Sequence, residues 1–377
     1  MDETTPTTPA QLARIFGRLS LTSFGGPAAH VALLRDEMVD RRQWLDNHRF
    51  LDLVGVTNLI PGPTSTELAM HIGHDRAGWR GLLAAGLGFI LPASLVVLGL
   101  AWVYDRFGRS AIGESLLDGI KPVVVVVVAA ALLKLLRVAV RGWLTGLVAT
   151  AATTAYLFGV NELVILGVGA TLVIALRLTV GTGMLLFSGD VVALLGPGTE
   201  AGPELGRLAL VFLKAGALLY GSGYVLAAFL HNDLVVEWGV MTEATLLDAI
   251  AIGQMTPGPL FTTATFIGYQ LAGLPGAVMA TLAIFLPSFV LVGSIARLGS
   301  LMRERPGAAA FLDGVNAASL GLMTGVTWQL ADDGINDPVT GLLAVATAVA
   351  VWRTKLNPAL LIAAGGLIGV ILGLLRV

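Results

Sequence analysis

Two short polar interruptions stand out in this otherwise apolar chain, because each combines helix-breaking residues with hydrogen-bonding side chains. The first PGP turn is the triplet Pro-Gly-Pro at residues 61–63, and the second PGP turn is the same triplet at residues 257–259. A helix that begins directly after such a turn presents unpaired backbone N–H groups and a partial positive charge of about half a unit. Two such helix ends inside a membrane, with hydroxyl groups beside them, would suit an anion.

The side chains around each turn are mostly neutral hydrogen-bonding groups. Hydroxyl side chains follow both triplets, and a carboxamide precedes each one, Asn58 in the first case and Gln254 in the second. The alternative is that the prolines only kink a helix and the hydroxyls only cap it. Repetition of the whole arrangement favours binding over capping. The candidate anion ligands at the turns are Asn58, Gly62, Thr64, Ser65, Thr66, Gln254, Gly258, Thr262 and Thr263.

Two basic residues are candidates for holding the anion by charge. Arg18 and Lys214 lie at equivalent positions within the first apolar helix of each half, seven residues before a pair of small residues. A cation at membrane depth is energetically costly and points to a function. The alternative, snorkelling of the side chain to the membrane interface, is stronger for Arg18. The small-residue pairs, also candidate ligands, are Gly25, Gly26, Gly221 and Ser222.

Four further residues are candidates for coupling or gating. Glu67 is the one carboxyl beside the two turns, and its counterpart is Thr263, so Glu67 could carry a proton or pair with a cation. His30 and His71 belong to the residue type that titrates near neutral pH, although lone histidines are more often structural. Lys121 opens an apolar span, where it either snorkels to the interface or attracts anions.

Composition indicates a membrane protein. The 377 residues are 55% hydrophobic and only 13% charged, whereas soluble domains carry about 25% charged residues. Lipid admits helices or closed barrels, and the apolar runs lack the short alternating pattern of a barrel. We therefore predict an all-α polytopic membrane protein. Apolar stretches of transmembrane length occupy residues 82–103, 123–136, 163–176, 208–230, 277–295 and 360–375.

The chain also carries an internal duplication. Sliding the sequence against itself by 196 residues superimposes the first PGP turn on the second and Arg18 on Lys214. With one gap, at an offset of 195, the match continues as Pro92 meets Pro287. Residues between the halves are rich in glycine and proline, as a linker should be. The predicted organisation is a disordered tail at 1–8, a first repeat at 9–180, a linker at 181–204 and a second repeat at 205–377.

Charge distribution predicts that the two repeats are inverted. Residues 35–49 carry four arginines, whereas the equivalent residues 231–245 carry three acidic residues and neither Lys nor Arg. The positive-inside rule places the first segment in the cytoplasm and the second outside. Inverted repeats with broken helices are typical of secondary transporters.

The broken segments are too short to cross a bilayer of about 30 Å on either side of the turn. Because Arg76 and Arg80 follow the segment after the first PGP turn, both of its ends are expected at the cytoplasmic face. We predict a re-entrant hairpin with the turn at its tip, and a single interrupted span is the alternative. The predicted fold has about ten transmembrane helices plus two re-entrant hairpins.

The chain lacks the residue patterns that several classes of enzyme require. The chain has no cysteine, which excludes disulfides, thiolate metal sites and a cysteine nucleophile. No zinc-protease spacing, Walker A motif or dinucleotide fingerprint is present. We therefore expect neither an enzyme nor a metal or organic cofactor.

Long motifs in both halves resemble the chromate transporter family. They include "FGRLSLTSFGGPAAH" and "IPGPTSTELAMHIG" in the first half, and "GQMTPGPLFTTATFIGY" and "FLDGVNAA" in the second. The resemblance covers residues 11–140 and 207–330, and it implies export of chromate across the bacterial inner membrane, driven by the membrane potential or by proton antiport. It also implies competition by sulfate, a near-isosteric dianion. The chain departs from the family pattern at Asn58 and Glu67; the carboxylate favours proton coupling or a changed substrate.

Alternative functions stay open at this point. Sulfate, molybdate or another solute could be the cargo, because tetrahedral dianions share size and charge. A cation carrier would need acidic pairs in the repeats, and only Glu67 is available there. A non-transporting membrane protein would not need symmetric helix breaks. The expected partners are a chromate or sulfate-like oxyanion, protons, the lipid bilayer and a second copy in a homodimer, with no nucleic acid.

Overall fold

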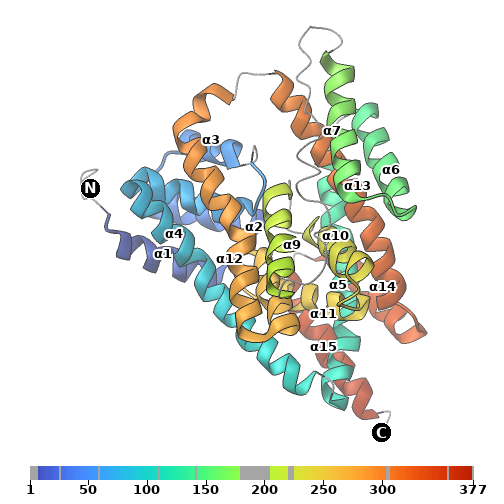
Figure 1. Ribbon diagram of the computed structural model, residues 1–377. Helices are drawn as coiled ribbons and strands as arrows, with labels where there is room; N and C mark the ends of the chain where they lie inside the picture. The colour runs from blue at the N-terminus through green and yellow to red at the C-terminus, as the bar shows by residue number, and fades with distance from the viewer. Residues whose placement is uncertain are drawn as a thin grey trace.

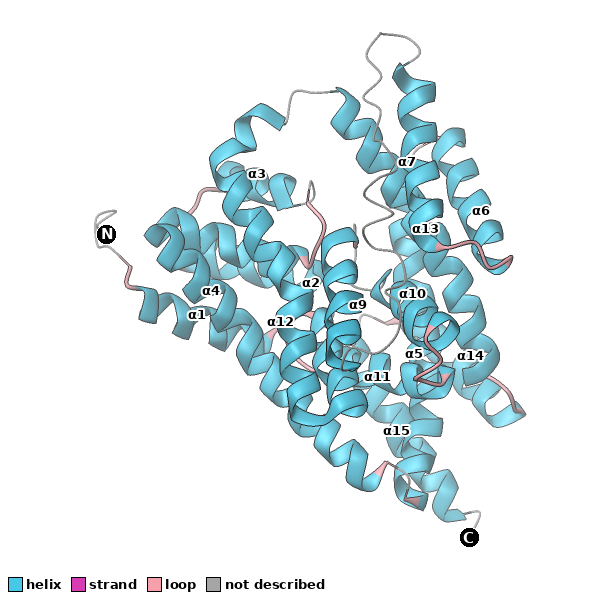
Figure 2. Cartoon of the chain, in the orientation of Figure 1, coloured by secondary structure: helices cyan, strands magenta, loops and turns pink. Residues whose placement is uncertain are grey.

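The structure is a computed structural model in which every regular element is helical among the residues described (Figures 1 and 2). These residues are 7–24, 27–57, 60–108, 110–140, 142–178, 204–219, 225–302, 306–354 and 356–375. The all-α prediction is therefore confirmed for this part of the chain. The predicted linker at 181–204 falls almost wholly outside the described residues, as do residues 1–6 of the predicted tail.

Helices of the first half begin where the sequence supplies caps. Thr8 and Gln11 form a capping box for the first helix, with Pro9 at its first position. Ser110 caps another through the N–H of Gly113. The elements are α1 (Pro9–Thr22), α2 (Pro27–Arg35) with a π-helical turn η1 (Asp36–Arg41), α3 (Asn47–Thr57), α4 (Thr64–Phe107), α5 (Ala111–Ala139), α6 (Trp143–Leu157) and α7 (Glu162–Leu178).

The second half repeats this order from α9 onward. Its long helix α12 follows the second PGP turn through a short 3-10 helix, whereas α4 follows the first turn directly. The elements are α9 (Glu204–Leu218), α10 (Leu226–Leu230) with a π-helical turn η3 (His231–Glu237), α11 (Glu243–Met255), η4 (Leu260–Thr262), α12 (Thr263–Met302), α13 (Pro306–Gly334), α14 (Pro338–Arg353) and α15 (Pro358–Leu375).

The long helices α4 and α12 are each broken a second time, by the same backbone device. Ala77 and Gly78 leave helical geometry in α4, and Gly78 adopts φ +58°. Ala272 and Gly273 do the same in α12, where Gly273 adopts φ +60°. Positive φ is accessible to glycine without steric cost, which explains the residue at each break. Each long helix is therefore two segments joined by a sharp kink.

Packing follows the duplication of the elements. α1 packs along α4 and α9 packs along α12, while α4 and α12 pack on each other between them. On the other side, α13 packs on α5, α6 and α7, and α15 packs on α5. Figure 1 shows α1 and α4 at the left, α6, α7 and α14 at the right, and α9 and α12 between them. The ends of α1 and α9 are thus brought to the middle of the molecule.

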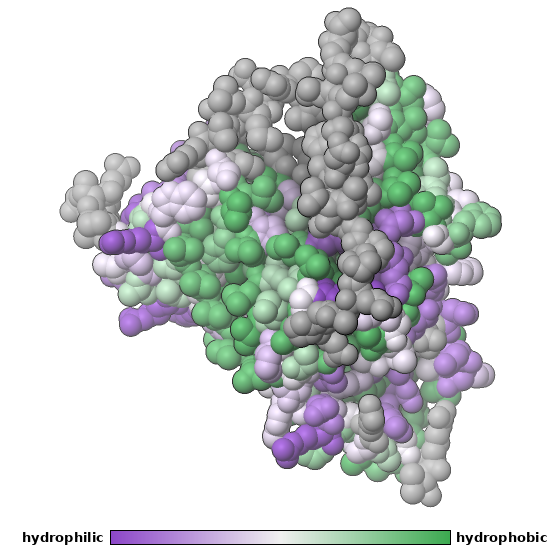
Figure 3. Space-filling view, viewed as in Figure 1, coloured by the Kyte–Doolittle hydropathy of each residue, from purple (hydrophilic) through white to green (hydrophobic). Residues whose placement is uncertain are grey.

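The surface agrees with a membrane environment. In the part of the chain that the structure describes, four helical stretches are long and apolar enough to cross a bilayer: Thr64–Phe107, Ala111–Arg137, Leu260–Ser294 and Pro358–Leu375. Apolar side chains also cover broad areas of the face seen in Figure 3. A polytopic membrane protein is therefore supported. The count of about ten spans and the two re-entrant hairpins stay predictions, because α7 and α14 are apolar but shorter.

Candidate functional site

The two PGP turns lie at the crossing of the two halves and are held by reciprocal hydrogen bonds. The Gly62 N–H of the first turn donates to the Leu219 carbonyl at the end of α9, at 2.8 Å. The Gly258 N–H of the second turn donates to the Ser23 carbonyl at the end of α1, at 2.9 Å. Each turn therefore seats on the first helix of the other half. The two bonds join positions that the internal duplication makes equivalent.

Both central glycines are required by geometry. Gly62 adopts φ +134° and Gly258 adopts φ +96°, conformations that residues with a Cβ rarely take. A Cβ on Gly62 would clash with the Glu67 carboxylate and the Ser288 hydroxyl. A Cβ on Gly258 would clash with Ala93 of α4. The turns are thus packed closely against α4 and α12.

A chain of hydrogen bonds connects the two turns. The His30 ring hydrogen-bonds to the Ser23 backbone, which also accepts from Gly258 of the second turn. On the other side, His30 Nδ1 lies 3.3 Å from the Ser65 hydroxyl, two residues after the first turn. His30 is buried. His30 therefore lies between the two turns in this chain of hydrogen bonds, and its role as a coupling residue stays a prediction.

The first PGP turn faces a buried carboxyl. Glu67 is fully buried and its Oε1 accepts a hydrogen bond from the Ser288 hydroxyl of α12 at 3.1 Å. Its Oε2 has no hydrogen-bond partner among the described residues, and neither has the Thr66 hydroxyl. Burying a carboxyl is costly unless it is paired or protonated. The arrangement can hold a proton or donate to a ligand at this turn.

Unpaired buried polar atoms collect around both turns. Native proteins leave few such atoms, so a group of them calls for a ligand, water or proton. Ser20 lies beside Gly258, Ser94 follows Ala93, and His71 lies one helical turn after Glu67. In the part of the chain described, the side-chain atoms near the turns without a partner are Ser20 Oγ, Thr66 Oγ1, Glu67 Oε2, His71 Nε2 and Ser94 Oγ.

The capping alternative does not match the geometry. The residue before each new helix is a proline, Pro63 or Pro259, and no side chain caps the helix there. The hydroxyls of Thr262 and Thr263 donate instead to the backbone carbonyls three residues earlier, at 2.9 and 2.8 Å. Gln254 and Thr263 also line a small cavity of about 20 Å³ among apolar side chains. That volume holds about one water molecule.

The two predicted cations do not meet at the turns. Arg18 lies on the exposed face of α1, opposite the buried Leu12, Phe16 and Leu19. Lys214 is ion-paired with Glu162 of α7, at 2.8 Å, and with Asp233 of η3. Among the contacts of the described residues, neither cation reaches a PGP turn. The structure therefore separates these two residues from the rest of the predicted anion site.

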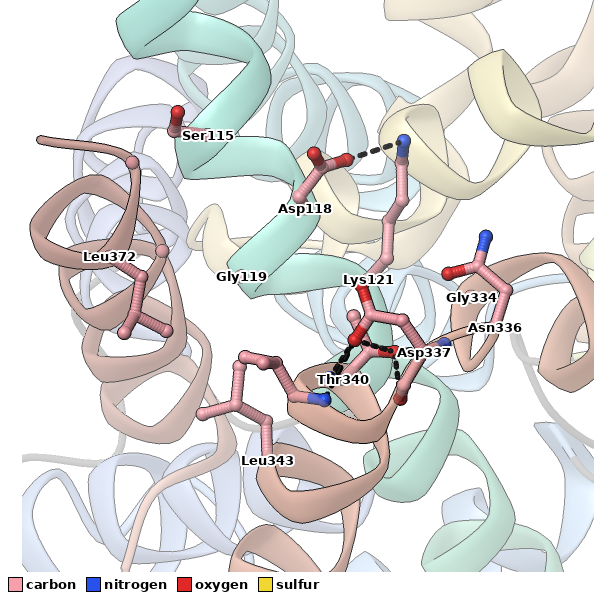
Figure 4. A pocket seen from close by; sticks show the side chains of 13 residues that line it. Ser115, Asp118, Gly119, Lys121, Gly334, Asn336, Asp337, Thr340, Leu343 and Leu372 are labelled. Carbon is pink, nitrogen blue, oxygen red and sulfur yellow. Dashed lines mark hydrogen bonds and ion pairs between the residues drawn. The ribbon is translucent and has the colours of Figure 1, made fainter. Parts of the chain in front are cut away.

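Lys121 lies at a different cavity, also away from the turns. Its Nζ is 3.5 Å from Asp118 and 3.9 Å from Asp248, and Asp248 in turn accepts from Tyr104. The cavity, of about 180 Å³, lies between α5, α14 and α15, and Asn336 lies on the same side of the view as Lys121 (Figure 4). With two carboxylates beside it, the charge of Lys121 is compensated, which disfavours anion attraction.

Several predicted residues lie outside the described part of the chain: Gly25, Gly26, Asn58, Gly221 and Ser222. Conversely, the sequence did not single out Ser20, Ser23 or Ser288. Ser288 follows Pro287, a proline inside α12 that the duplication pairs with Pro92 of α4. That equivalence was a signal that could have found it. Within the described residues, no cluster of three or more His, Asp or Glu side chains is arranged to hold a metal ion.

Comparison with known proteins gives matches along the chain. The family model described as "Chromate transporter" matches at residues 10–174 and again at 206–370. The chromate transport protein of Cupriavidus metallidurans is 32% identical, over 98% of this chain and 94% of the relative. That of Pseudomonas aeruginosa is 31% identical, over 97% and 92%. The probable chromate transport protein of Synechococcus elongatus is 30% identical, over 96% and 95%. No solved structure matches the chain.

Proposed function

This chain belongs to the chromate transporter family, and from that premise we propose that it is a secondary transporter that exports chromate, with the two PGP turns as the anion site. Its relatives are named as transport proteins, which supports a transporter rather than an enzyme. The observation that carries this proposal is the chain of hydrogen bonds through Ser23, His30 and Ser65 that connects the two turns, with buried polar atoms without partners beside it. The bacterial inner membrane is the proposed location.

Neutral donors bind the dianion in this proposal. A tetrahedral dianion needs hydrogen-bond donors on several sides. The hydroxyls of Thr66, Ser94 and Ser20 have no other acceptor among the described residues, and Ser288 lies beside Gly62. The uncapped helix starts after Pro63 and Pro259 add backbone N–H groups and partial positive charge.

Glu67 makes this site dependent on protonation. An ionised carboxylate next to Gly62 would repel a dianion, whereas a protonated carboxyl is neutral and can donate a hydrogen bond. We assign Glu67 the role of a proton carrier that is protonated when the anion binds. His30, in contact with Ser65 and Ser23, lies on a path for that proton between the two turns.

The membrane potential is sufficient to drive export. Moving one charge through 100 mV is worth about 2.3 kcal/mol, so a dianion that leaves a negative interior gains about 4.6 kcal/mol. At about 1.4 kcal/mol for each factor of ten, this supports a concentration ratio of roughly three orders of magnitude. Proton movement is then a means of control rather than the main source of energy.

Alternating access follows from the duplicated architecture. The equal kinks at Gly78 and Gly273 and the crossed bonds from Gly62 and Gly258 support two inverted repeats around one site. In inverted-repeat transporters, one repeat rocks against the other around a fixed midplane site. We propose that each PGP segment is a re-entrant hairpin whose tip forms half of the site.

Flux measurements on purified protein in liposomes test this function. With an imposed potential, we expect radiolabelled chromate flux that sulfate inhibits and that falls at least tenfold in Thr66→Ala/Ser288→Ala. Ser294→Ala is the matched control, because Ser294 lies on the exposed side of α12 and bonds only to its own helix. Unchanged chromate flux in the double variant would contradict the site. Sulfate flux without chromate flux would contradict the cargo.

A further inference from the structure

A second buried polar cluster lies away from the PGP turns, where α7, α9 and η3 meet. Lys214 of α9 contacts two carboxylates, Glu162 at the start of α7 and Asp233 in η3. Glu162 is fully buried, the Asp233 side chain is 4% exposed and that of Lys214 is 12% exposed. We call these three side chains the acid-lysine triad. It connects a helix of the first half with two elements of the second.

The charges of the triad do not balance. If all three groups are ionised, the triad carries a net charge of −1 in a site almost closed to water. One oxygen of each carboxylate, Glu162 Oε2 and Asp233 Oδ2, has no hydrogen-bond partner in the described structure. Unpaired buried charge is unfavourable, and two carboxylates that share a site cannot easily both ionise. A single bound proton would neutralise the triad.

The groups around the triad do not supply the missing positive charge. His231 lies 2.8 Å from the Tyr156 hydroxyl and 3.3 Å from a Glu243 oxygen, so its own charge would be shared with Glu243. Glu237 adds a further carboxylate, which accepts from Asn161 and Asn232. The other cation near this end, Arg207, lies over the ring of Trp238. In and around the triad, the described residues therefore include four carboxylates and three basic side chains.

From this geometry we infer that the acid-lysine triad is a proton-binding site, separate from the anion site, in which Glu162 and Asp233 share one exchangeable proton beside Lys214. The proton binds to one of the two unpaired carboxylate oxygens and changes the charge of the triad from −1 to zero. No bond to carbon forms or breaks, and no further reactant is needed.

The position of Lys214 couples the triad to the anion site through α9. Lys214 lies on α9, and Leu219 follows the same helix and accepts the Gly62 N–H of the first PGP turn. Loading or removing the proton changes how strongly α9 is held to α7 and η3. This coupling to transport rests on the proposed function, whereas the binding of the proton does not.

Infrared spectroscopy of the full chain in lipid nanodiscs tests proton binding without any transported anion. The protein carries Glu67→Gln throughout, so that the Glu67 carboxyl does not contribute. We expect a protonated-carboxyl band that disappears as the pH rises across the neutral range. It should be lost in Asp233→Asn, which leaves one carboxylate for one lysine. Glu237→Gln, at an exposed carboxyl, is the control and should keep the band.

Two results would overturn the inference: no such band in the Glu67→Gln protein, or a band unchanged by Asp233→Asn. If Asp233→Asn fails to fold, Glu162→Gln makes the same charge change from the other side of the lysine. In liposomes, the pH dependence of flux should flatten in Asp233→Asn. If Asp233→Asn loses the band but the pH dependence of its flux is unaltered, the triad binds a proton that is not coupled to transport. These outcomes are separate from a failure to transport chromate.

Discussion

The two PGP turns have the same backbone role and different chemistry. Each seats its glycine N–H on the first helix of the opposite half, Gly62 on Leu219 and Gly258 on Ser23. The first turn then faces a carboxyl and the Ser288 hydroxyl, whereas the second turn faces Ala93 and the Ser20 hydroxyl and no carboxyl. The frame is therefore nearly symmetric while the functional groups are not.

This difference indicates how the two halves of a duplicated fold become chemically unequal. The residues that fix the geometry, the glycines and prolines of the turns and kinks, are present in both halves. The residue that we propose as the proton carrier at the first turn is placed once. Glu67 has Thr263 as its counterpart, and the exposed Arg18 has as its counterpart Lys214, which is only partly exposed and is ion-paired. Changes to frame residues should thus act alike in both halves, and changes to the others should not.

Removal of the buried lysine should have the largest effect. Lys214→Gln leaves Glu162 and Asp233 without their cation, and breaking a buried ion pair from one side costs about 3–5 kcal/mol. We expect a large loss of thermal stability in detergent, measured by circular dichroism. A partial recovery in Lys214→Gln/Asp233→Asn would support the charge argument. Stability equal to wild type in Lys214→Gln would contradict it.

The turn glycines should come next, with similar effects in the two halves. Gly62→Ala and Gly258→Ala force a Cβ into positive φ and into close contacts, which costs about 1–3 kcal/mol each. Gly258→Ala should be the more damaging, because Ala93 is held by α4 while the Glu67 side chain can move. Thermal unfolding of both, with Gly99→Ala as a helical control in open space, measures this. If one of the two variants were as stable as wild type, the two turns would not have the same structural role.

Hydroxyl changes at the two turns should differ in function. Ser288→Ala removes the donor to Glu67, and an unsatisfied buried acceptor costs about 1–3 kcal/mol. We expect roughly tenfold weaker chromate flux. The equivalent exchange, Ala93→Ser, adds a hydroxyl at the second turn and should leave flux within about twofold. Equal effects would show that the asymmetry at the turns has no functional meaning.

The exposed arginine should matter least. Arg18→Gln alters a side chain on the outer face of α1, and such changes usually stay within about 0.5 kcal/mol. We expect thermal stability and chromate affinity close to wild type, measured by circular dichroism and by the chromate dependence of flux in liposomes. A loss of chromate affinity of tenfold or more would show that Arg18 belongs to the anion site.

Local patterns predicted the site's frame better than its charges. The helix that starts at Thr64 follows from the prolines before it, and the sequence showed both PGP turns directly. The face of α1 was also readable, because Leu12, Phe16 and Leu19 recur at helical spacing and leave Arg18 opposite. The predicted site nevertheless included Arg18, because the duplication pairs this residue with Lys214.

Long-range pairing was not readable. Lys214 hydrogen-bonds to Glu162 in a helix of the other half, and Ser288 hydrogen-bonds to Glu67, which lies more than two hundred residues away in the sequence. No local spacing encodes such contacts, because they depend on how α4 packs on α12 and α9 packs near α7. The sequence therefore located the breaks in the helices but not the partners that neutralise or complete them.

The most direct test of whether the two PGP turns form the anion site is to locate the bound anion. Crystals of the full chain soaked in chromate would show the chromium atom by anomalous scattering. The account predicts one strong peak between the two PGP turns, within hydrogen-bond reach of the Thr66 and Ser288 hydroxyls. A peak at the Lys121 cavity with none between the turns would contradict it.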